Sequence, residues 1–259
     1  MSLVIIKGAG DLATGIAHRL FQSGFEIAMT EVNQPTVVRR TVAFAQAIFS
    51  GEATVEGVKA KHVERSEITA TLSEGIIPVV IDPMGQCISE LRPCAVVDAI
   101  IAKCNLGTTL NDAPIVIGVG PGFTAGVDVG AVVETVRGHD MGRVYYQGCA
   151  IANTGIPGEV GGYSIERLLK SPAAGEFNSL RAIGDTISKG DVVGEVSGVE
   201  VKTAISGVLR GLIRDGLMVK TGMKIGDVDP RCNQEHCFTI SDKGRAIGGG
   251  VLEAILHFS

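Results

Sequence analysis

The sequence predicts an α/β protein in which a parallel sheet is followed by a small β domain. Through the first half of the 259-residue chain, short apolar runs rich in valine and isoleucine alternate with amphipathic stretches. That alternation is typical of a parallel sheet covered by helices on both faces. In the second half, a short pattern of glycines and β-branched residues occurs twice at one offset. Such a repeat predicts a β unit built from two similar halves.

The first half is expected to form strands and helices in turn. Residues 3–7 are predicted to form a buried strand because the run is apolar up to its last residue, and residues 12–23 to form a helix that Gly24 ends. Further strands are expected at residues 26–31, 57–63, 76–81 and 115–119, and further helices at residues 36–49 and about 94–104.

A glycine-rich turn joins the first strand to the first helix. Gly8, Gly10 and Ala13 match the pattern G-x-G-x-x-A, in which the glycines let a pyrophosphate approach the backbone and the helix N–H groups bind it. Glu31 follows Gly10 by 21 residues (31 − 10) and ends the second strand. At this position of a Rossmann domain, a carboxylate accepts a hydrogen bond from a ribose hydroxyl. The turn therefore predicts a Rossmann-like domain that binds NAD or another nucleotide.

Asp11 argues against this interpretation. Its carboxylate lies beside the expected anion site and opposes a pyrophosphate unless it caps the helix or turns away. A turn retained only for packing, or one that binds another ligand, therefore stays an alternative.

A second glycine turn follows the expected strand at residues 115–119. It contains Gly118, Gly120 and Gly122. Because ligands of open α/β sheets bind at the carboxyl ends of the strands, we expect these glycines and Asp82 to line the same crevice as Gly8 and Gly10. An ordinary tight turn is the alternative for each.

The repeat in the second half pairs residues 184–196 with residues 216–228 at an offset of 32 (216 − 184). Its pattern resembles the biotinyl/lipoyl barrel-sandwich module, over about residues 180–230. Four apolar residues of the two copies are expected to point inward, namely Ile187, Val193, Val219 and Ile225. Lys202 lies in an alternating strand rather than at a hairpin tip. We therefore expect no covalent biotin or lipoate.

Charge and composition exclude several classes of partner. The net charge is −5 and no basic run interleaves with aromatics, so nucleic acid is not expected to bind. Every long apolar run is interrupted and the cysteines are scattered, which predicts a cytoplasmic protein without membrane contact. Cys232, His236 and Cys237 lack the usual zinc spacing, so no metal is expected. No histidine pairs by spacing with a carboxylate, and the catalytic residues stay unknown.

The expected fold class is therefore α/β, with a Rossmann-like parallel sheet domain plus a small β barrel-sandwich (biotinyl/lipoyl-like) domain. The expected boundaries place the nucleotide-binding domain at residues 1–175 and the barrel-sandwich at residues 176–232. Residues 233–259 are expected to pack back on the core.

Six segments spread from end to end of the chain together resemble the YqeB family. They read GAGDLATG, GVGPGFTAG, NTGIPG, VLRGLIRDG, KIGDVDPR and ISDKGRAIGGGVLEAI. The family comprises bacterial accessory proteins associated with selenium-dependent molybdenum hydroxylases. The N-terminal part is also similar to the Rossmann domains of XdhC-type maturation factors, at Gly8, Gly10, Ala13 and Gly15.

The resemblance implies an accessory or maturation factor that binds a nucleotide or a nucleotide-bearing molybdenum cofactor. Its expected partner is a molybdenum hydroxylase or the maturation machinery of one. The barrel is expected to serve as a docking or oligomerisation surface, so a homo-oligomer is a further expectation. The resemblance assigns no reaction to particular residues. An NAD-dependent oxidoreductase is the alternative from another class, and a structural adaptor with an inactive nucleotide fold is a third.

Overall fold

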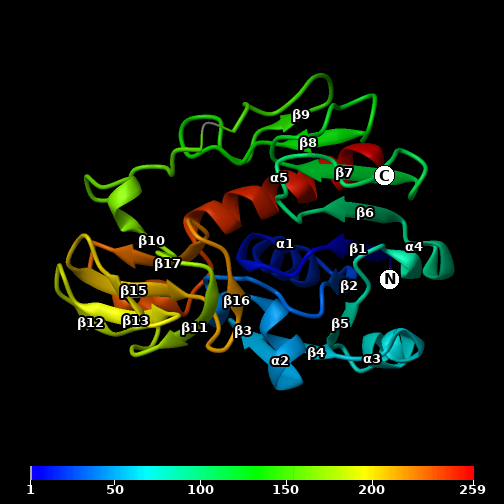
Figure 1. Ribbon diagram of the computed structural model, residues 1–259. Coiled ribbons are helices and arrows are strands. Elements are labelled where there is room, and N and C mark those ends of the chain that lie inside the picture. Colours follow the sequence, from blue (N-terminus) through cyan, green and yellow to red (C-terminus); the bar gives the residue numbers. More distant parts are fainter. Residues whose placement is uncertain (1, 154) are drawn as a thin grey trace. The chain divides into compact units, whose positions relative to one another are not determined.

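The computed structural model describes residues 2–153 and 155–259 and divides them into two compact units (Figure 1). Unit 1 comprises the described residues of Met1–Pro35, Ala43–Thr154 and Ile240–Ser259. Unit 2 comprises Thr36–Val42 and Gly155–Thr239. The chain therefore divides at other positions than the expected 175/176 and 232/233.

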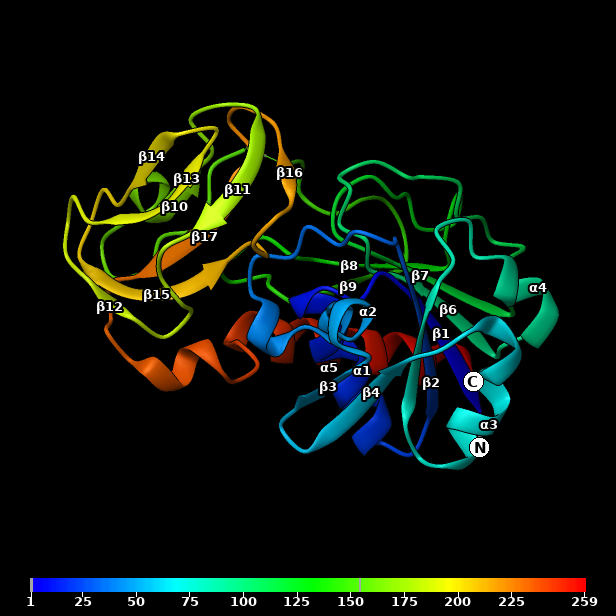
Figure 2. The ribbon, with the colours of Figure 1, turned by 60° about the horizontal axis from the view of Figure 1, so that its bottom comes forward.

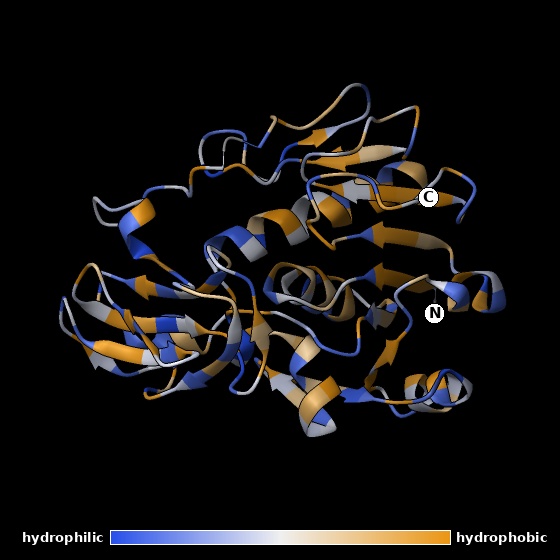
Figure 3. Ribbon diagram, in the orientation of Figure 1, coloured by the Kyte–Doolittle hydropathy of each residue, from blue (hydrophilic) through white to orange (hydrophobic). Residues whose placement is uncertain are grey.

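Unit 1 contains a nine-stranded sheet with the order β3-β4-β5-β2-β1-β6-β7-β8-β9. Neighbours from β4 to β8 run parallel, whereas β3 pairs with β4 and β9 with β8 in antiparallel fashion. Figure 3 shows the central strands β1, β6 and β7 as mainly apolar, in agreement with their burial. The strands are β1 (Leu3–Lys7), β2 (Glu26–Glu31), β3 (Glu52–Val55), β4 (Val58–His62), β5 (Ile77–Ile81), β6 (Ala95–Asp98), β7 (Ile115–Val119), β8 (Ala131–Val133) and β9 (Val144–Tyr145).

Two long helices of unit 1, α1 (Asp11–Gln22) and α5 (Asp242–Phe258), pack against each other (Figure 1). Glycines allow the close approach, because a Cβ at Gly15 would come within 3.0 Å of the backbone of Gly244. Three shorter helices complete the unit, namely α2 (Ala47–Ser50), α3 (Ile68–Ser73) and α4 (Gln86–Leu91). Among the described residues, no helix combines the length and the apolar character that a membrane crossing requires.

Two of the predicted helices do not form. Residues 94–104 instead supply β6 and an irregular loop, because a short valine-rich run suits a buried strand as well as a helix. Residues 36–49 form short 3₁₀ turns and α2. The side chain of Arg40 donates to the Leu212 carbonyl within unit 2, whereas the Phe44 N–H donates to Thr14 Oγ1 within unit 1. The two halves of this segment thus bond to different units, and no continuous helix forms.

Unit 2 consists of two four-stranded antiparallel sheets, with the orders β10-β17-β15-β12 and β14-β13-β11-β16 (Figure 2). Each copy of the sequence repeat contributes one strand to each sheet. All four residues predicted to point inward are buried, at 0–4% exposure. The strands are β10 (Leu168–Lys170), β11 (Gly175–Ser179), β12 (Thr186–Ile187), β13 (Val192–Val196), β14 (Val199–Lys202), β15 (Gly207–Leu212), β16 (Met218–Val219) and β17 (Lys224–Asp229).

The predicted fold class needs correction in both parts. The first sheet is mixed and nine-stranded, so it is not the parallel sheet of a Rossmann domain. The second unit is not a self-contained barrel-sandwich over residues 180–230, because both sheets take a strand from the preceding residues, β10 and β11. Residues 36–42 also pack into it, with Val38 against Gly211. The last 27 residues divide in the same way, since α5 belongs to unit 1 and residues up to Thr239 to unit 2.

Candidate functional site

The order in which strands are added to the sheet of unit 1 reverses between β1 and β6. From β1 the chain continues through β2 and β5 on one side, and it returns through β6 and β7 on the other side. In open α/β sheets a crevice forms at the carboxyl ends of the strands at such a point, because the loops leave in opposite directions. Lys7 and Asp98 are register partners at these two strand ends. The topology therefore places both side chains at the position where ligands usually bind.

Lys7, Asp98 and Thr108 form a buried polar cluster at these strand ends. The Lys7 Nζ donates to Thr108 Oγ1 at 2.5 Å and lies 3.5 Å from Asp98 Oδ2. Thr108 Oγ1 in turn donates to Asp98 Oδ2 at 2.6 Å. The three residues are 6%, 2% and 1% exposed. A buried lysine is costly unless it is paired, so the cluster must be kept together by its own contacts.

The loop after β6 carries Thr108 and has an unusual backbone. Ile101 and Lys103 both adopt positive φ angles, 60° and 66°. Such a conformation is costly for a β-branched side chain and often occurs near functional sites. The Asn105 side chain accepts the N–H groups of Gly107 and Thr108 and donates to the Thr108 carbonyl. These contacts fix Thr108 above the strand ends.

Other acidic residues at the strand ends bind backbone N–H groups of the loops. Glu134, directly after β8, is fully buried and accepts from Thr135, Val136 and Ile151 at 2.7–2.8 Å. Asp82, directly after β5, accepts from the Cys87 N–H at 2.8 Å. Burial alone raises the pKa of Asp82, but its backbone hydrogen bonds outweigh that effect and lower the pKa. These carboxylates hold the loops of the carboxyl edge in place.

Glu31 has the same role at the first glycine turn. Its Oε2 accepts the Ala9 N–H and its Oε1 the Val32 N–H, both at 2.9 Å. Burial raises the pKa of Glu31, and these two hydrogen bonds act in the opposite direction. The acid predicted to meet a ribose thus already binds the turn itself.

The remaining groups of the first turn also bond within the chain. The Ala9 carbonyl accepts a hydrogen bond from the Ala45 N–H at 2.8 Å, so the segment that contains Ala45 lies against the turn. Gly8 has a φ of +91°, and a Cβ there would come within 3.0 Å of the Ala99 carbonyl. Gly10 is the N-cap of α1, and Asp11 and Ala13 lie in its first turn. The first glycine turn therefore packs against neighbouring segments of unit 1. This agrees with the alternative interpretation, in which the turn is retained only for packing.

The second glycine turn packs on the loop after β6. A Cβ at Gly122 would come within 2.6 Å of the Cys104 backbone, and one at Gly118 within 2.5 Å of the Phe123 ring. Gly120 has a φ of +84° and faces Thr135. Both glycine turns thus contact the loop that carries Thr108, the first at Ala99 and the second at Cys104. That they line one crevice stays a prediction. Sequence reasoning missed Lys7, Asp98, Thr108 and Glu134; a lysine at the end of an apolar strand was the one available signal.

Unit 2 contains a second buried cluster of charges, on β15 and β17. Asp227 accepts from Arg167 Nη2 at 2.8 Å and from Arg210 Nε and Nη2 at 2.8 and 2.5 Å. Asp229 accepts from Arg231 Nε and Nη2 at 2.9 and 2.6 Å. Both carboxylates are at most 1% exposed. These ion pairs hold the strands of the unit together.

The ion pairs of Asp229 predict an acid-dependent loss of stability. Burial alone raises the pKa of Asp229, but the hydrogen bonds and charges of Arg231 and Arg210 outweigh it and lower the pKa to about 2. The pKa of Asp229 in the folded protein is below the unfolded value of about 4. The contribution of its carboxylate to the free energy of unfolding is therefore complete above pH 4 and is lost as the pH falls towards 2. We expect Asp229→Asn to remove about 2 kcal/mol of this pH dependence of the unfolding free energy. Urea denaturation from pH 2 to pH 5 measures it, and equal slopes for the parent and the variant would contradict it.

The three metal-ligand candidates of the second half do not come together. Within residues 2–153 and 155–259, no cluster of histidine, cysteine, aspartate and glutamate suits a metal ion. Cys237 is buried and its thiol contacts the Leu209 carbonyl, whereas Cys232 is exposed. Lys202 lies in β14 and pairs with Glu200 at 2.7 Å. The expectation that it carries no biotin or lipoate stays a prediction.

No family model matches the chain. Over 255 residues it is 52% identical to the "uncharacterized protein YqeB" of Escherichia coli K12, a match that covers 98% of this chain. The chain is homologous to YqeB. The chain spans about half the length of that relative, 47% of it. The name YqeB carries no activity, and the accessory role implied by the resemblance does not follow from it.

Solved structures with a distant likeness are described as succinylglutamate desuccinylase and aspartoacylase proteins. One from Silicibacter sp. and one from Mesorhizobium loti are each 12% identical with a TM-score of 0.26, and the match covers 88% of this chain and 84% of theirs. The ectoine utilization protein EutE of Ruegeria pomeroyi is 10% identical with a TM-score of 0.27, covering 88% and 85%. Likeness at this level transfers no activity to the chain.

The function predicted from the sequence is corrected at this point. The sheet is mixed, and Glu31 binds the glycine turn. The predictions of a molybdenum-related maturation factor and of an NAD-dependent oxidoreductase were therefore wrong.

Proposed function

We propose that unit 1 binds a small molecule with a carboxylate or carbonyl oxygen at the carboxyl ends of β1 and β6, where Lys7 faces it. The observation that carries this proposal is the buried Lys7–Asp98–Thr108 cluster at the point where the strand order of the sheet reverses. Ligand sites of open sheets occur at this position, and their few polar groups fix the orientation of the ligand.

The donor inventory of Lys7 supports a ligand oxygen. An ammonium group has three N–H donors. Of the contacts described, Thr108 Oγ1 takes one at 2.5 Å, and Asp98 Oδ2 lies at the longer distance of 3.5 Å. A ligand oxygen would use the remaining donor capacity, because a cation withdrawn from water is stabilised by each further acceptor.

The surrounding loops support a preformed site. Carboxylates hold the loop ends through backbone N–H groups, as Glu134 does at Ile151 and Glu31 at Ala9. Asn105 holds Thr108 in the same way. A ligand that enters such a site orders few side chains, which lowers the entropic cost of binding.

Nuclear magnetic resonance of the lysine Nζ groups tests this proposal. With ¹⁵N-lysine labelling, a buried and hydrogen-bonded ammonium gives a slowly exchanging signal, which Lys7→Arg would assign by its loss. We expect pyruvate, acetate or succinate at millimolar concentration to shift the Lys7 signal saturably. Lys103, exposed on the loop after β6, is the internal control and should not shift. If none of the acids moves Lys7 more than Lys103 in folded protein, the proposal fails.

A further inference from the structure

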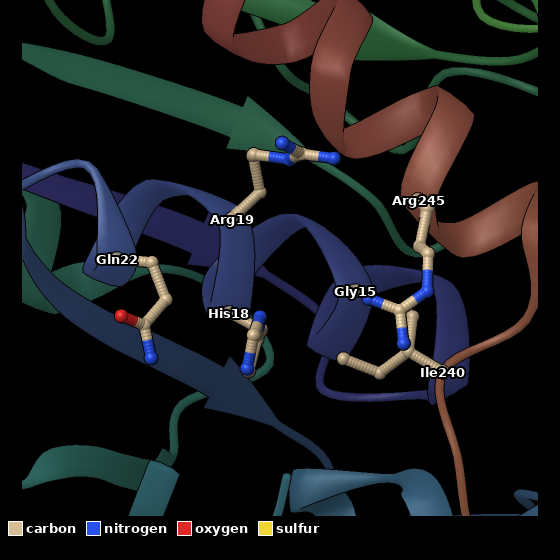
Figure 4. A pocket seen from close by; sticks show the side chains of 6 residues that line it. All are labelled: Gly15, His18, Arg19, Gln22, Ile240 and Arg245. Carbon is tan, nitrogen blue, oxygen red and sulfur yellow. The ribbon is translucent and has the colours of Figure 1, made fainter. Parts of the chain in front are cut away.

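A small open pocket lies on unit 1 where α1 and α5 cross (Figure 4). Its volume is about 130 Å³. The close contact of Gly15 with Gly244 brings the two helices together beneath it, and Arg19 packs with its Cβ 3.1 Å from the position a Cβ would take at Gly248. The pocket is lined by Gly15, His18, Arg19, Gln22, Ile240 and Arg245.

The polar side chains of the pocket are predominantly hydrogen-bond donors. Figure 4 shows Arg245 reaching from α5 towards Gly15, with Arg19 on one side of α1 and His18 and Gln22 on the other. Two guanidinium groups, an imidazole and an amide thus line the pocket. Guanidinium groups favour oxyanions because their N–H groups match the spacing of the oxygens.

Two carboxylates lie near the pocket and both are engaged. Asp242, in the first turn of α5, pairs with Arg137. Glu56, at the tip of the β3–β4 hairpin, accepts the Ile240 N–H at 2.8 Å and pairs with Arg245 Nη2 at 2.7 Å, both through Oε1. Burial raises the pKa of Glu56, but these contacts and the positive charges of Arg245 and His18 outweigh it and lower the pKa. Among the described residues, no carboxylate forms an ion pair with Arg19. The pocket therefore keeps an excess of positive charge.

The beginning of α5 adds to this charge. Ile240 and Arg245 flank the N-cap Ser241, so the pocket lies at the positive end of a 17-residue helix. The helix dipole favours an anion there. The volume of about 130 Å³ holds about four water molecules at about 30 Å³ each, which is room for a tetrahedral oxyanion.

We propose that this pocket binds a tetrahedral oxyanion, either inorganic phosphate or the phosphate group of a phosphomonoester. Arg19 and Arg245 would bind its oxygens from α1 and α5, with His18 and Gln22 as further donors. The site is separate from the Lys7 cluster and does not depend on the function proposed for it.

Calorimetric titration of the whole chain with inorganic phosphate, sulfate and glycerol 3-phosphate tests the proposal at constant ionic strength. We expect Arg19→Ala and Arg245→Ala each to weaken phosphate binding about tenfold or more, because each removes a charge-assisted hydrogen bond. Glu56→Gln should strengthen it about threefold, because it removes a nearby negative charge and retains an acceptor for Ile240. Tighter binding of glycerol 3-phosphate than of phosphate would identify a phosphomonoester as the preferred ligand.

The matched control is Arg65→Ala, which removes an exposed arginine of the same unit that pairs with Glu90 outside the pocket. It should leave phosphate binding unchanged, and thermal unfolding of each variant would show that it is folded. If the folded parent binds no phosphate or sulfate, or if Arg19→Ala and Arg245→Ala bind as the parent does, the proposal is overturned.

Discussion

Asp227→Asn should destabilise unit 2 by about 3–5 kcal/mol, the typical effect of removing one partner from a buried ion pair. The carboxylate is 1% exposed and neutralises two arginines, Arg167 and Arg210, whose side chains are 6% and 12% exposed. An amide keeps the shape of the side chain but leaves both guanidinium groups without their shared negative charge. Urea denaturation monitored by a probe in unit 2 measures the change.

Glu200→Gln provides the matched control for this prediction, because Glu200 lies in the same unit. Glu200 also forms an ion pair, with Lys202, but the two side chains are 57% and 59% exposed. Exposed pairs of this kind contribute at most about 1 kcal/mol because water solvates both partners. A loss at Asp227 no larger than that at Glu200 would show that the buried network does not hold β15 and β17 together.

Lys7→Met should destabilise unit 1 by about 3–5 kcal/mol, since it leaves the buried Asp98 carboxylate without its cation. The Thr108 hydroxyl and the Ile100 N–H still donate to this carboxylate, but neither carries a charge. Denaturation of the single variant measures the loss. Because the unit has a mixed sheet with β1 at its centre, the whole unit is expected to respond.

The double variant Lys7→Met with Asp98→Asn distinguishes loss of charge pairing from loss of packing. The amide introduced by Asp98→Asn would still accept the Ile100 N–H, so the pair of substitutions removes both charges and keeps the shape. We expect the double variant to be more stable than Lys7→Met alone, because a buried ion pair is often replaced by neutral groups at little cost. Additive effects of the two substitutions would contradict a coupled pair.

The features of the fold that could be predicted from the sequence are those with local signals. The first strand, helix and second strand are confirmed nearly to the residue, as Leu3–Lys7, Asp11–Gln22 and Glu26–Glu31. Their signals are local, namely an apolar run, helical spacing and a terminating glycine. The inward residues of the repeat are confirmed for the same reason, because alternation along a strand decides which side chains face the core.

The helix predicted at residues 36–49 was wrong for a reason that is not local. In unit 2, Arg40 donates to the carbonyl of Leu212, which lies 172 residues away. In unit 1, the Phe44 N–H donates to Thr14. The spacing of apolar residues within the segment carries no information about those partners. The prediction of a parallel sheet was wrong at the two edges, where β3 pairs with β4 and β9 pairs with β8 in antiparallel fashion.

The sequence by itself determined the strand and helix periods of the first 31 residues, the glycine turns at the carboxyl ends of strands, and the buried face of the repeat. Only the tertiary structure decided that Lys7 meets Asp98 and Thr108, that Asp227 joins Arg167 to Arg210, and that Glu31 binds its own turn. The physical reason is the range of the interactions. Periodicity and turn conformation depend on neighbours along the chain, whereas a buried charge is neutralised by whichever partner the folded backbone brings within reach, 60 residues away for Asp227 and Arg167.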